Sequence, residues 1–185
     1  LKTPLTSIIG YLTLLRDEKD ISIELRAKYT GIALEKAERL EDLINEFFDI
    51  TRFNLTSITL EKEQINLSRM AEQIVSEFEP VLSEKDLRWN IHIEPDIMMV
   101  CDSNKLERVF DNLIRNAVNY SYRNTEIKVC LTKNNKEIVL KVENYGRTIS
   151  SEKLEHIFEQ FFRLDSARSS STGGAGLGLA IAKEI

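Results

Sequence analysis

The sequence predicts an α+β chain of two parts, a helical hairpin followed by an α/β sandwich. Over the first ~55 residues, apolar side chains recur at helical spacing. After Thr56, runs of alternating apolar and polar residues indicate strands, and amphipathic helices separate these strands. The expected domain boundary divides residues 1–54 from residues 55–185.

The composition is that of an ordinary globular protein. Of 185 residues, 42% are hydrophobic and 30% are charged. The net charge of −5 argues against nucleic acid or an acidic membrane surface as the main partner. Cys101 and Cys130 show neither a CxxC pair nor metal-ligand spacing, so two reduced thiols are expected. The sequence has no run of about 18 apolar residues, so no span across a bilayer is predicted.

The opening segment, LKTPLTSIIGYL, combines a helical apolar stripe with a proline. Leu1, Leu5, Ile8 and Leu12 share one side of a helix, yet Pro4 lacks the N–H that a helix interior needs. No capping residue precedes the run. We therefore expect this helix to begin upstream of Leu1.

A second, longer helix is predicted from about Ile23 to Phe53, with Ser22 as its N-cap. Its apolar stripe comprises Leu25, Tyr29, Ile32, Leu40, Leu43, Phe47 and Ile50. Two helices cannot bury stripes this wide, so a second copy is expected to complete a dimeric four-helix bundle. The alternative is a bundle formed with the rest of the same chain.

In the second part, local patterns predict several short elements. Helices are expected at 68–82, from Asp102 or Ser103 to Tyr120, at 152–158, and from near Gly176 onward. Strands are expected within 58–67 and at 87–94, 98–101, 126–132 and 137–143, the last two joined by a hairpin at 133–136.

The helix that ends near Tyr120 carries two asparagines, Asn112 and Asn116. They lie four residues apart and share a face, opposite a core side that we expect to comprise Leu106, Val109, Leu113 and Ala117. Two amide oxygens suit hydrated Mg²⁺, which prefers oxygen ligands. The alternative is plain helix surface.

The segment VENYGRTIS follows a predicted strand. Gly146 has no side chain, so a flat ring can approach the backbone closely at this position. The amide oxygen of Asn144 can accept from a purine amino group, and Ile149 can pack on the ring. The alternative is an ordinary N-x-G turn.

The segment SSSTGGAGLGLAIAKEI is a glycine-rich run that leads into a helix, so it offers backbone N–H groups to phosphate. A flexible linker is the alternative. Before it, Phe158, Phe161 and Phe162 are expected to pin a lid to the sheet. Arg163 and Arg168 are candidates to reach a phosphate.

In this order, these segments resemble the N, G1, F and G2 boxes of the sensor histidine kinases. LKTPLTSIIGYL resembles the end of that family's H box, H-E-L-K-T-P-L. Within the family, the chain is most similar to the VanS-type sensors of glycopeptide (vancomycin) resistance. The resemblance implies an ATP-binding domain of the histidine kinase, Hsp90 and gyrase type. The implied activity is transfer from Mg-ATP to a histidine, and then to an aspartate of a response regulator.

The resemblance also assigns roles in the nucleotide site. Asn116 matches a Mg²⁺ ligand, Asn112 matches a residue of the same phosphate site, and Tyr120 matches an aromatic near the nucleotide. The G2 match covers Gly174, Ala175, Gly176, Leu177 and Gly178.

Three positions depart from the family pattern. Asn119 replaces a usual lysine, Asn144 replaces an aspartate, and Thr148 replaces a glycine. With the charge at 119 gone, Arg163 or Arg168 is expected to carry more of the phosphate contact. The departures imply a site that binds the nucleotide less tightly.

On the hairpin, the resemblance places the phosphoacceptor histidine two residues before Leu1, outside this sequence. Thr3 matches a threonine that positions water for hydrolysis of the phosphorylated regulator, which docks near Thr3, Ile8 and the second helix. His92 and His156 match no acceptor. A homodimer is implied, and membrane segments outside the sequence. The alternatives are an ATPase of the same superfamily and a degenerate adaptor that binds ATP without kinase activity.

Overall fold

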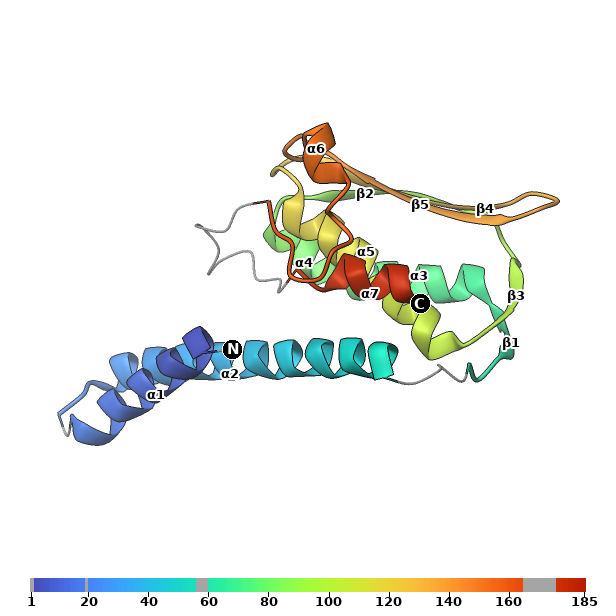
Figure 1. Cartoon of the computed structure of the whole chain (residues 1–185). Coiled ribbons are helices and arrows are strands. Elements are labelled where there is room, and N and C mark those ends of the chain that lie inside the picture. The colour runs from blue at the N-terminus through green and yellow to red at the C-terminus, as the bar shows by residue number, and fades with distance from the viewer. Residues whose placement is uncertain (1, 19, 56–59, 165–175) are drawn as a thin grey trace. The chain divides into compact units, whose positions relative to one another are not determined.

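The computed structural model describes residues 2–18, 20–55, 60–164 and 176–185. The chain divides into two compact units, Leu1–Thr56 and Ser57–Ile185 (Figure 1). None of the described helices combines the length and apolar composition needed to cross a membrane.

The first unit is a hairpin of α1 (Lys2–Asp17) and α2 (Ile23–Leu55). Ser22 caps α2 as predicted, because its Oγ accepts from the Leu25 N–H at 3.2 Å. The two helices contact each other through Tyr11 and Tyr29, whose ring centroids lie 5.4 Å apart. Pro4 is accommodated within α1.

The hairpin has more apolar surface than its two helices cover. Of its described side chains, that of Ala33 is buried. Leu5 and Leu12, which were expected to share the packed stripe with Ile8, are instead exposed. The described large apolar side chains left exposed on the hairpin are Leu5, Ile9, Leu12, Leu14, Ile23, Leu34, Ile44, Phe47 and Phe48. A second copy remains the predicted cover.

The second unit has a helical layer on one face of a three-stranded sheet (Figure 1). The sheet has the order β2 (Arg88–Ile93), β4 (Glu126–Lys133), β5 (Ile138–Asn144). Strand β4 pairs parallel to β2 and antiparallel to β5, with Lys133 opposite Ile138 at the hairpin. A separate antiparallel ribbon pairs β1 (Glu63–Asn66) with β3 (Met98–Cys101). The helices are α3 (Leu67–Glu77), α4 (Glu79–Glu84), α5 (Ser103–Tyr120), α6 (Ser151–Leu154) and α7 (Gly178–Glu184).

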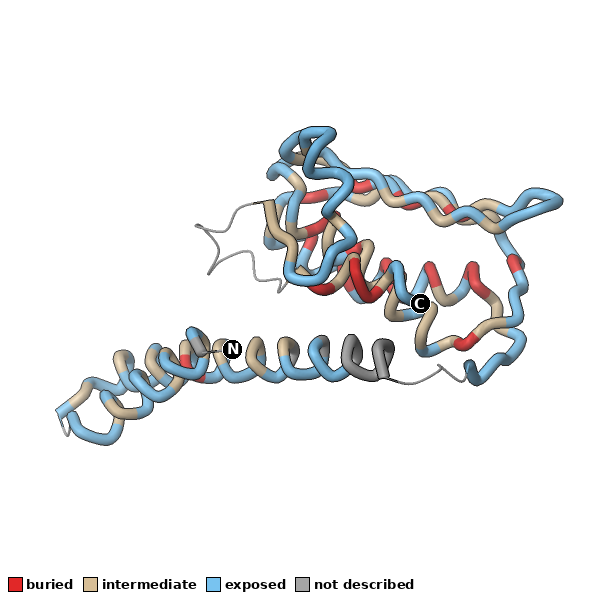
Figure 2. Tube along the Cα trace, viewed as in Figure 1, coloured by how far each residue is buried: buried red, intermediate tan, exposed pale blue. Residues whose placement is uncertain are grey.

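The core lies between the sheet and the helical layer (Figure 2). Alternate residues of β4, namely Ile127, Val129 and Leu131, are fully buried because successive strand side chains point to opposite faces. Helix α5 meets them with Phe110, Ile114, Ala117 and Val118. The expected stripe was therefore wrong at Val109 and Leu113, which are half-buried, because the core face of α5 is centred about one residue further along the chain.

Three helical predictions differ from the structure. The helix expected at 68–82 is divided at Phe78, because Pro80 cannot donate to the carbonyl four residues earlier. Helix α6 has only four residues. Helix α7 begins at Gly178 and not near Gly176, because Gly176 has a left-handed φ of +77°.

Candidate functional site

Helix α5 is fixed at its beginning by Asp102. Its two carboxylate oxygens accept from the backbone N–H groups of Lys105, at 3.2 Å, and Glu61, at 3.1 Å. Burial acts to raise the pKa of Asp102, but these hydrogen bonds and the Lys105 charge together hold it below its ordinary value. The carboxylate therefore caps α5 and joins it to the segment before β1.

Asn112, Asn116 and Asn119 share one face of α5, because they stand at positions i, i+4 and i+7. All three are half-buried. The Nδ2 atom of Asn112 is buried and has no hydrogen-bond partner among the described residues. This amide can therefore turn toward a ligand without breaking an internal bond.

Helix α7 packs on α5 through Gly178. A Cβ atom at Gly178 would lie 3.1 Å from Asn112 Oδ1, so a side chain there would displace the amide. Gly176 lies two residues earlier, and its carbonyl accepts from the Phe161 N–H at 3.0 Å. Gly178 of the predicted G2 segment therefore lies at the asparagine face of α5, and Gly176 lies beside the segment 161–163.

The segment after β5 returns to the end of α5. Ser121 and Gly146 form a β-bridge, and the Tyr122 N–H donates to the Tyr145 carbonyl at 2.8 Å. A Cβ atom at Gly146 would overlap the carbonyl of Tyr120. The group that lies too close to Gly146 for a side chain is thus the protein's own backbone. From the sequence, we expected that group to be the ring of a ligand.

Around this junction lie the residues predicted to hold the purine. The side chains of Asn144 and Tyr120 are exposed, and that of Ile149 is half-buried. The Asn144 Nδ2 atom would lie 3.2 Å from a Cβ at Gly146, so the amide borders the glycine. Thr148, where the family has glycine, is exposed.

The predicted phosphate contacts are described in part. Half-buried Arg163 places its Cγ 3.2 Å from where a Gly176 Cβ would lie, so it stands beside the glycine. The side chain of Leu177 is buried, with 1% exposed, so only its backbone can contact a ligand. Arg168, Gly174 and Ala175 lie outside the described residues.

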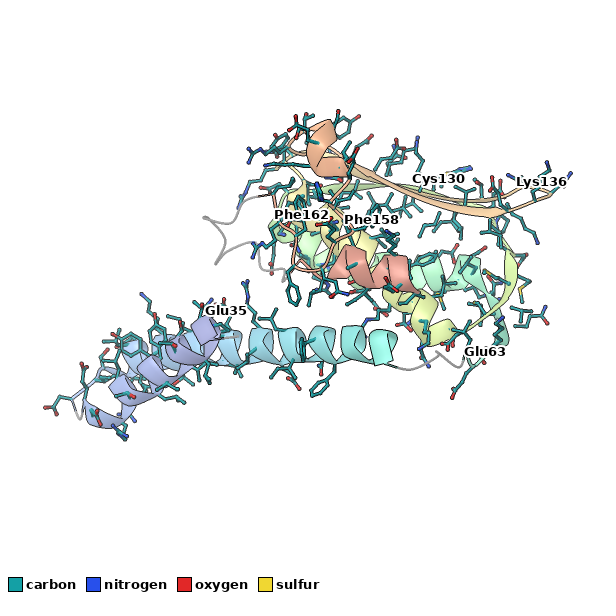
Figure 3. All side chains as sticks on the ribbon, in the orientation of Figure 1. Glu35, Glu63, Cys130, Lys136, Phe158 and Phe162 are labelled. Carbon is teal, nitrogen blue, oxygen red and sulfur yellow. The ribbon has the colours of Figure 1, made fainter. Side chains whose placement is uncertain are left out.

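The aromatic residues before the glycine run do not act as expected. Phe158 and Phe161 are exposed, so neither ring packs on the sheet as predicted, and the lid that they were expected to hold lies outside the described residues. Phe158 lies under Lys183 of α7, with Nζ 5.7 Å from the ring centroid, and Phe162 lies 5.8 Å from the ring of His156 (Figure 3). Glu159 contacts His156 Nδ1 at 2.7 Å and raises the pKa of this exposed histidine.

Sequence reasoning missed Lys85. Its Nζ donates to Asn119 Oδ1 at 3.0 Å and to the Val118 carbonyl at 3.3 Å. Burial lowers the pKa of Lys85, and Glu84 acts against this. The contact spans 34 positions of the chain, so no local pattern could have indicated it.

The described residues contain no cluster of three or more His, Cys, Asp or Glu side chains arranged to hold a metal ion. A bound Mg²⁺ would thus depend on asparagine oxygens, water and the oxygens of its ligand, a donor set that suits this ion. The amide oxygen of half-buried Asn116 fits that donor set, whereas the unpartnered Nδ2 of Asn112 is a donor that suits a phosphate oxygen.

Thr3 lies in the first turn of α1 and is exposed. Its carbonyl accepts from Ser7 Oγ at 3.2 Å. The side chain is therefore accessible on the hairpin, one turn before half-buried Ile8.

Comparisons with known proteins give the family. Residues 1–55 match the family described as "His Kinase A (phospho-acceptor) domain", and residues 101–185 match "Histidine kinase-, DNA gyrase B-, and HSP90-like ATPase". The chain belongs to the sensor histidine kinase family. This sensor kinase chain is 51% identical over all 185 residues to the sensor protein VanSC of Enterococcus gallinarum and 50% identical to the sensor protein VanS of Enterococcus faecium. It spans about half of each relative, 51% and 48% of their lengths.

Solved structures agree with the fold. The histidine kinase AdeS of Acinetobacter baumannii has a TM-score of 0.78 at 23% identity, over 99% of this chain and 83% of that one. The histidine kinase ThkA, in complex with the response regulator protein TrrA, has a TM-score of 0.70 at 25% identity, over 88% of this chain and 47% of that one. The predicted family and fold class, a helical hairpin followed by an ATPase-type α/β domain, are confirmed.

Proposed function

We propose that this chain is the catalytic part of a VanS-type sensor histidine kinase in glycopeptide (vancomycin) resistance signalling. It binds ATP with Mg²⁺ and transfers the γ-phosphoryl group to a histidine on the helical hairpin, and then to an aspartate of a response regulator. The observation that carries the proposal is the approach of Gly178 to Asn112, which joins the G2 segment to the asparagine face of α5. The 50–51% identity to VanS and VanSC supports the subfamily.

The phosphate end of the nucleotide site is assigned to α5 and the glycine run. Asn116 supplies an oxygen ligand to Mg²⁺, and Asn112 and Asn119 serve the same site. Bound Mg²⁺ supplies neutralisation of charge on the phosphates. The further phosphate contacts are Arg163, Arg168 and the backbone of Gly174, Ala175, Gly176, Leu177 and Gly178.

The purine end is assigned to the junction between β5 and α5. Asn144 accepts from the purine amino group, Ile149 packs against the ring, Tyr120 borders it, and Gly146 holds the junction closed. An amide accepts less strongly than a carboxylate, by roughly a factor of two in hydrogen-bond strength. We therefore expect an affinity for ATP below that of a site with aspartate at 144.

The hairpin is assigned dimerisation, phosphotransfer and phosphatase roles. Its exposed apolar side chains support a homodimer. The acceptor histidine is placed two residues before Leu1, and Thr3 positions water to hydrolyse the phosphorylated regulator. The regulator docks near Thr3, Ile8 and α2, and segments beyond this chain anchor the whole protein in the membrane.

Calorimetric titration with Mg-ATP tests the nucleotide site. The unmutated chain should bind, and Asn116→Asp should weaken binding more than roughly tenfold, because it adds negative charge beside the phosphates. Asn135→Asp, at an exposed turn between β4 and β5, is the matched control and should bind normally. Equal affinity of the Asn116→Asp variant and the unmutated chain would contradict the assignment.

A degenerate adaptor is the second candidate, favoured by the departures at Asn119, Asn144 and Thr148. An adaptor that has lost the nucleotide site would show no Mg-ATP binding although folded and dimeric. Sedimentation of the same samples would establish the dimer. Binding of Mg-ATP by the unmutated chain excludes this form of the adaptor hypothesis.

A further inference from the structure

The backbone of the turn that carries Lys85 is hydrogen-bonded to α4 and to the segment that follows α5. Lys85 is the C-cap that follows α4, and Asp86 comes next in a left-handed conformation with φ of 55°. The Asp86 carbonyl accepts from the Asn124 N–H at 3.0 Å, and the Leu87 N–H donates to Leu82 at 2.9 Å. The backbone beneath the Lys85 side chain is therefore fixed on both sides.

The Lys85 ammonium determines how the Asn119 amide is oriented. An ammonium group only donates, so the Asn119 atom at 3.0 Å must be its oxygen, Oδ1. The Nδ2 group, with two donors, is then directed away from Lys85. Asn119 lies on the α5 face that also carries Asn112 and Asn116.

We propose that Lys85 is a positioning residue for the phosphates of the nucleotide: it holds Asn119 Oδ1 so that the Nδ2 donors face the phosphate site. The inference rests on the proposed function and extends it to a residue outside the four sequence boxes. A side-chain donor on this face, polarised by an ammonium at its oxygen, is a stronger partner for an anionic oxygen than an isolated amide.

A purely structural role for Lys85 predicts a different result. Its second contact, to the Val118 carbonyl, caps the last turn of α5. If capping were the whole role, loss of Lys85 would loosen the end of α5 and weaken binding of every ligand alike. Comparing a ligand that has phosphates with one that has none separates the two roles.

The test titrates Mg-ATP and adenosine into the 185-residue chain and its variants. Lys85→Met should weaken Mg-ATP binding roughly tenfold, the size of one hydrogen bond to a charged group, and adenosine binding less than about twofold. Lys85→Arg, which keeps charge and donors, should stay within about threefold of the unmutated chain for Mg-ATP. Lys136→Met, at the exposed tip of the β4–β5 hairpin (Figure 3), is the matched control and should change neither affinity.

A double-mutant cycle tests whether Lys85 acts through Asn119. Asn119→Ala should cause the same selective loss, and the double variant should bind no worse than either single variant. If the Lys85→Met variant does not fold, the inference is tested by the other two variants. Asn119→Ala should lose affinity for Mg-ATP but not for adenosine, and Lys85→Arg should keep its affinity for Mg-ATP.

Equal loss of Mg-ATP and adenosine, or additive effects of the two mutations, would overturn the inference while the proposed function stands. If the unmutated chain failed to bind Mg-ATP, the proposed function would fail, and this inference with it.

Discussion

Gly146 faces the main-chain carbonyl of Tyr120 so closely that no side chain fits between them. The contact lies beside the Ser121–Gly146 bridge and joins the end of α5 to the segment after β5. It thereby brings Asn144 near the end of the helix that carries the asparagine face. One glycine thus holds the two halves of the candidate nucleotide site together.

The first prediction concerns this junction. Gly146→Ala should destabilise the unit Ser57–Ile185 by about 1–3 kcal/mol, the usual cost of overpacking, because a Cβ would overlap the Tyr120 carbonyl. Urea unfolding measures the loss. Gly31→Ala is the control, since nothing lies within 4 Å of its Cβ position on α2, and it should stabilise the hairpin by about 0.5–1 kcal/mol. An unchanged unfolding midpoint for Gly146→Ala would show that the junction yields easily.

The second prediction is that replacing Asn112 has opposite effects on the stability of the chain and on its binding of Mg-ATP. Its Nδ2 atom is buried without a partner, so Asn112→Leu should raise the stability of the nucleotide-free chain by roughly 1 kcal/mol. The same variant should lose Mg-ATP binding, because the amide is gone. Thermal unfolding with and without Mg-ATP measures both effects. A variant that is less stable, or still stabilised by Mg-ATP, would contradict the role given to this amide.

The third prediction concerns the contribution of Asp102 to the stability of the folded chain at low pH. The folded-state pKa of Asp102 lies below its ordinary value of 3.8, so the unfolded chain takes up the proton first as the pH falls. The contribution of this group is complete above about pH 4 and is lost as the pH falls toward the folded-state pKa. Asp102→Asn should be less stable than the unmutated chain at pH 7, and the difference should shrink toward pH 3. Urea unfolding across this range is the measurement, with exposed Asp20→Asn as control; a difference that stays constant with pH would contradict the assignment.

The fourth prediction concerns Thr3 and the regulator. Thr3→Ala should slow dephosphorylation of the phosphorylated response regulator by roughly 10²-fold, because the attacking water loses its positioning. Binding of Mg-ATP should be unchanged. Thr13→Ala, at a half-buried position further along α1, is the control. Release of phosphate from a labelled regulator is the measurement, and equal rates for both variants would remove Thr3 from the phosphatase reaction.

The elements that the sequence predicted well are those governed by local periodicity and caps. The α2 start at Ser22, the α5 start at Asp102 and the β4–β5 hairpin follow from short patterns. The break at Phe78 could also have been expected from Pro80, two residues later. Which residues of α5 face the core could not be predicted. Apolar residues lie on several sides of this helix, so more than one rotation of the helix about its axis would bury an apolar stripe.

The contacts that form the candidate site join residues far apart in the chain. The sequence therefore predicted which residues belong to the site but not which of them are in contact. The Gly146–Tyr120 junction, the Gly178–Asn112 approach and the Lys85–Asn119 hydrogen bond each join segments distant in the chain. Lys85 carries no motif of its own. The exposure of Phe158 and Phe161 likewise depends on tertiary packing, which aromatic composition alone does not determine.

Phosphoryl transfer to histidine tests the central claim most directly. The chain, extended upstream through the expected histidine, is incubated with γ-labelled ATP and Mg²⁺, and the labelled protein is then exposed to acid and to base. The label should be lost in acid and survive base, as phosphohistidine does, and it should be absent when this histidine is replaced by glutamine. A folded, dimeric protein that acquires no label would contradict the kinase assignment.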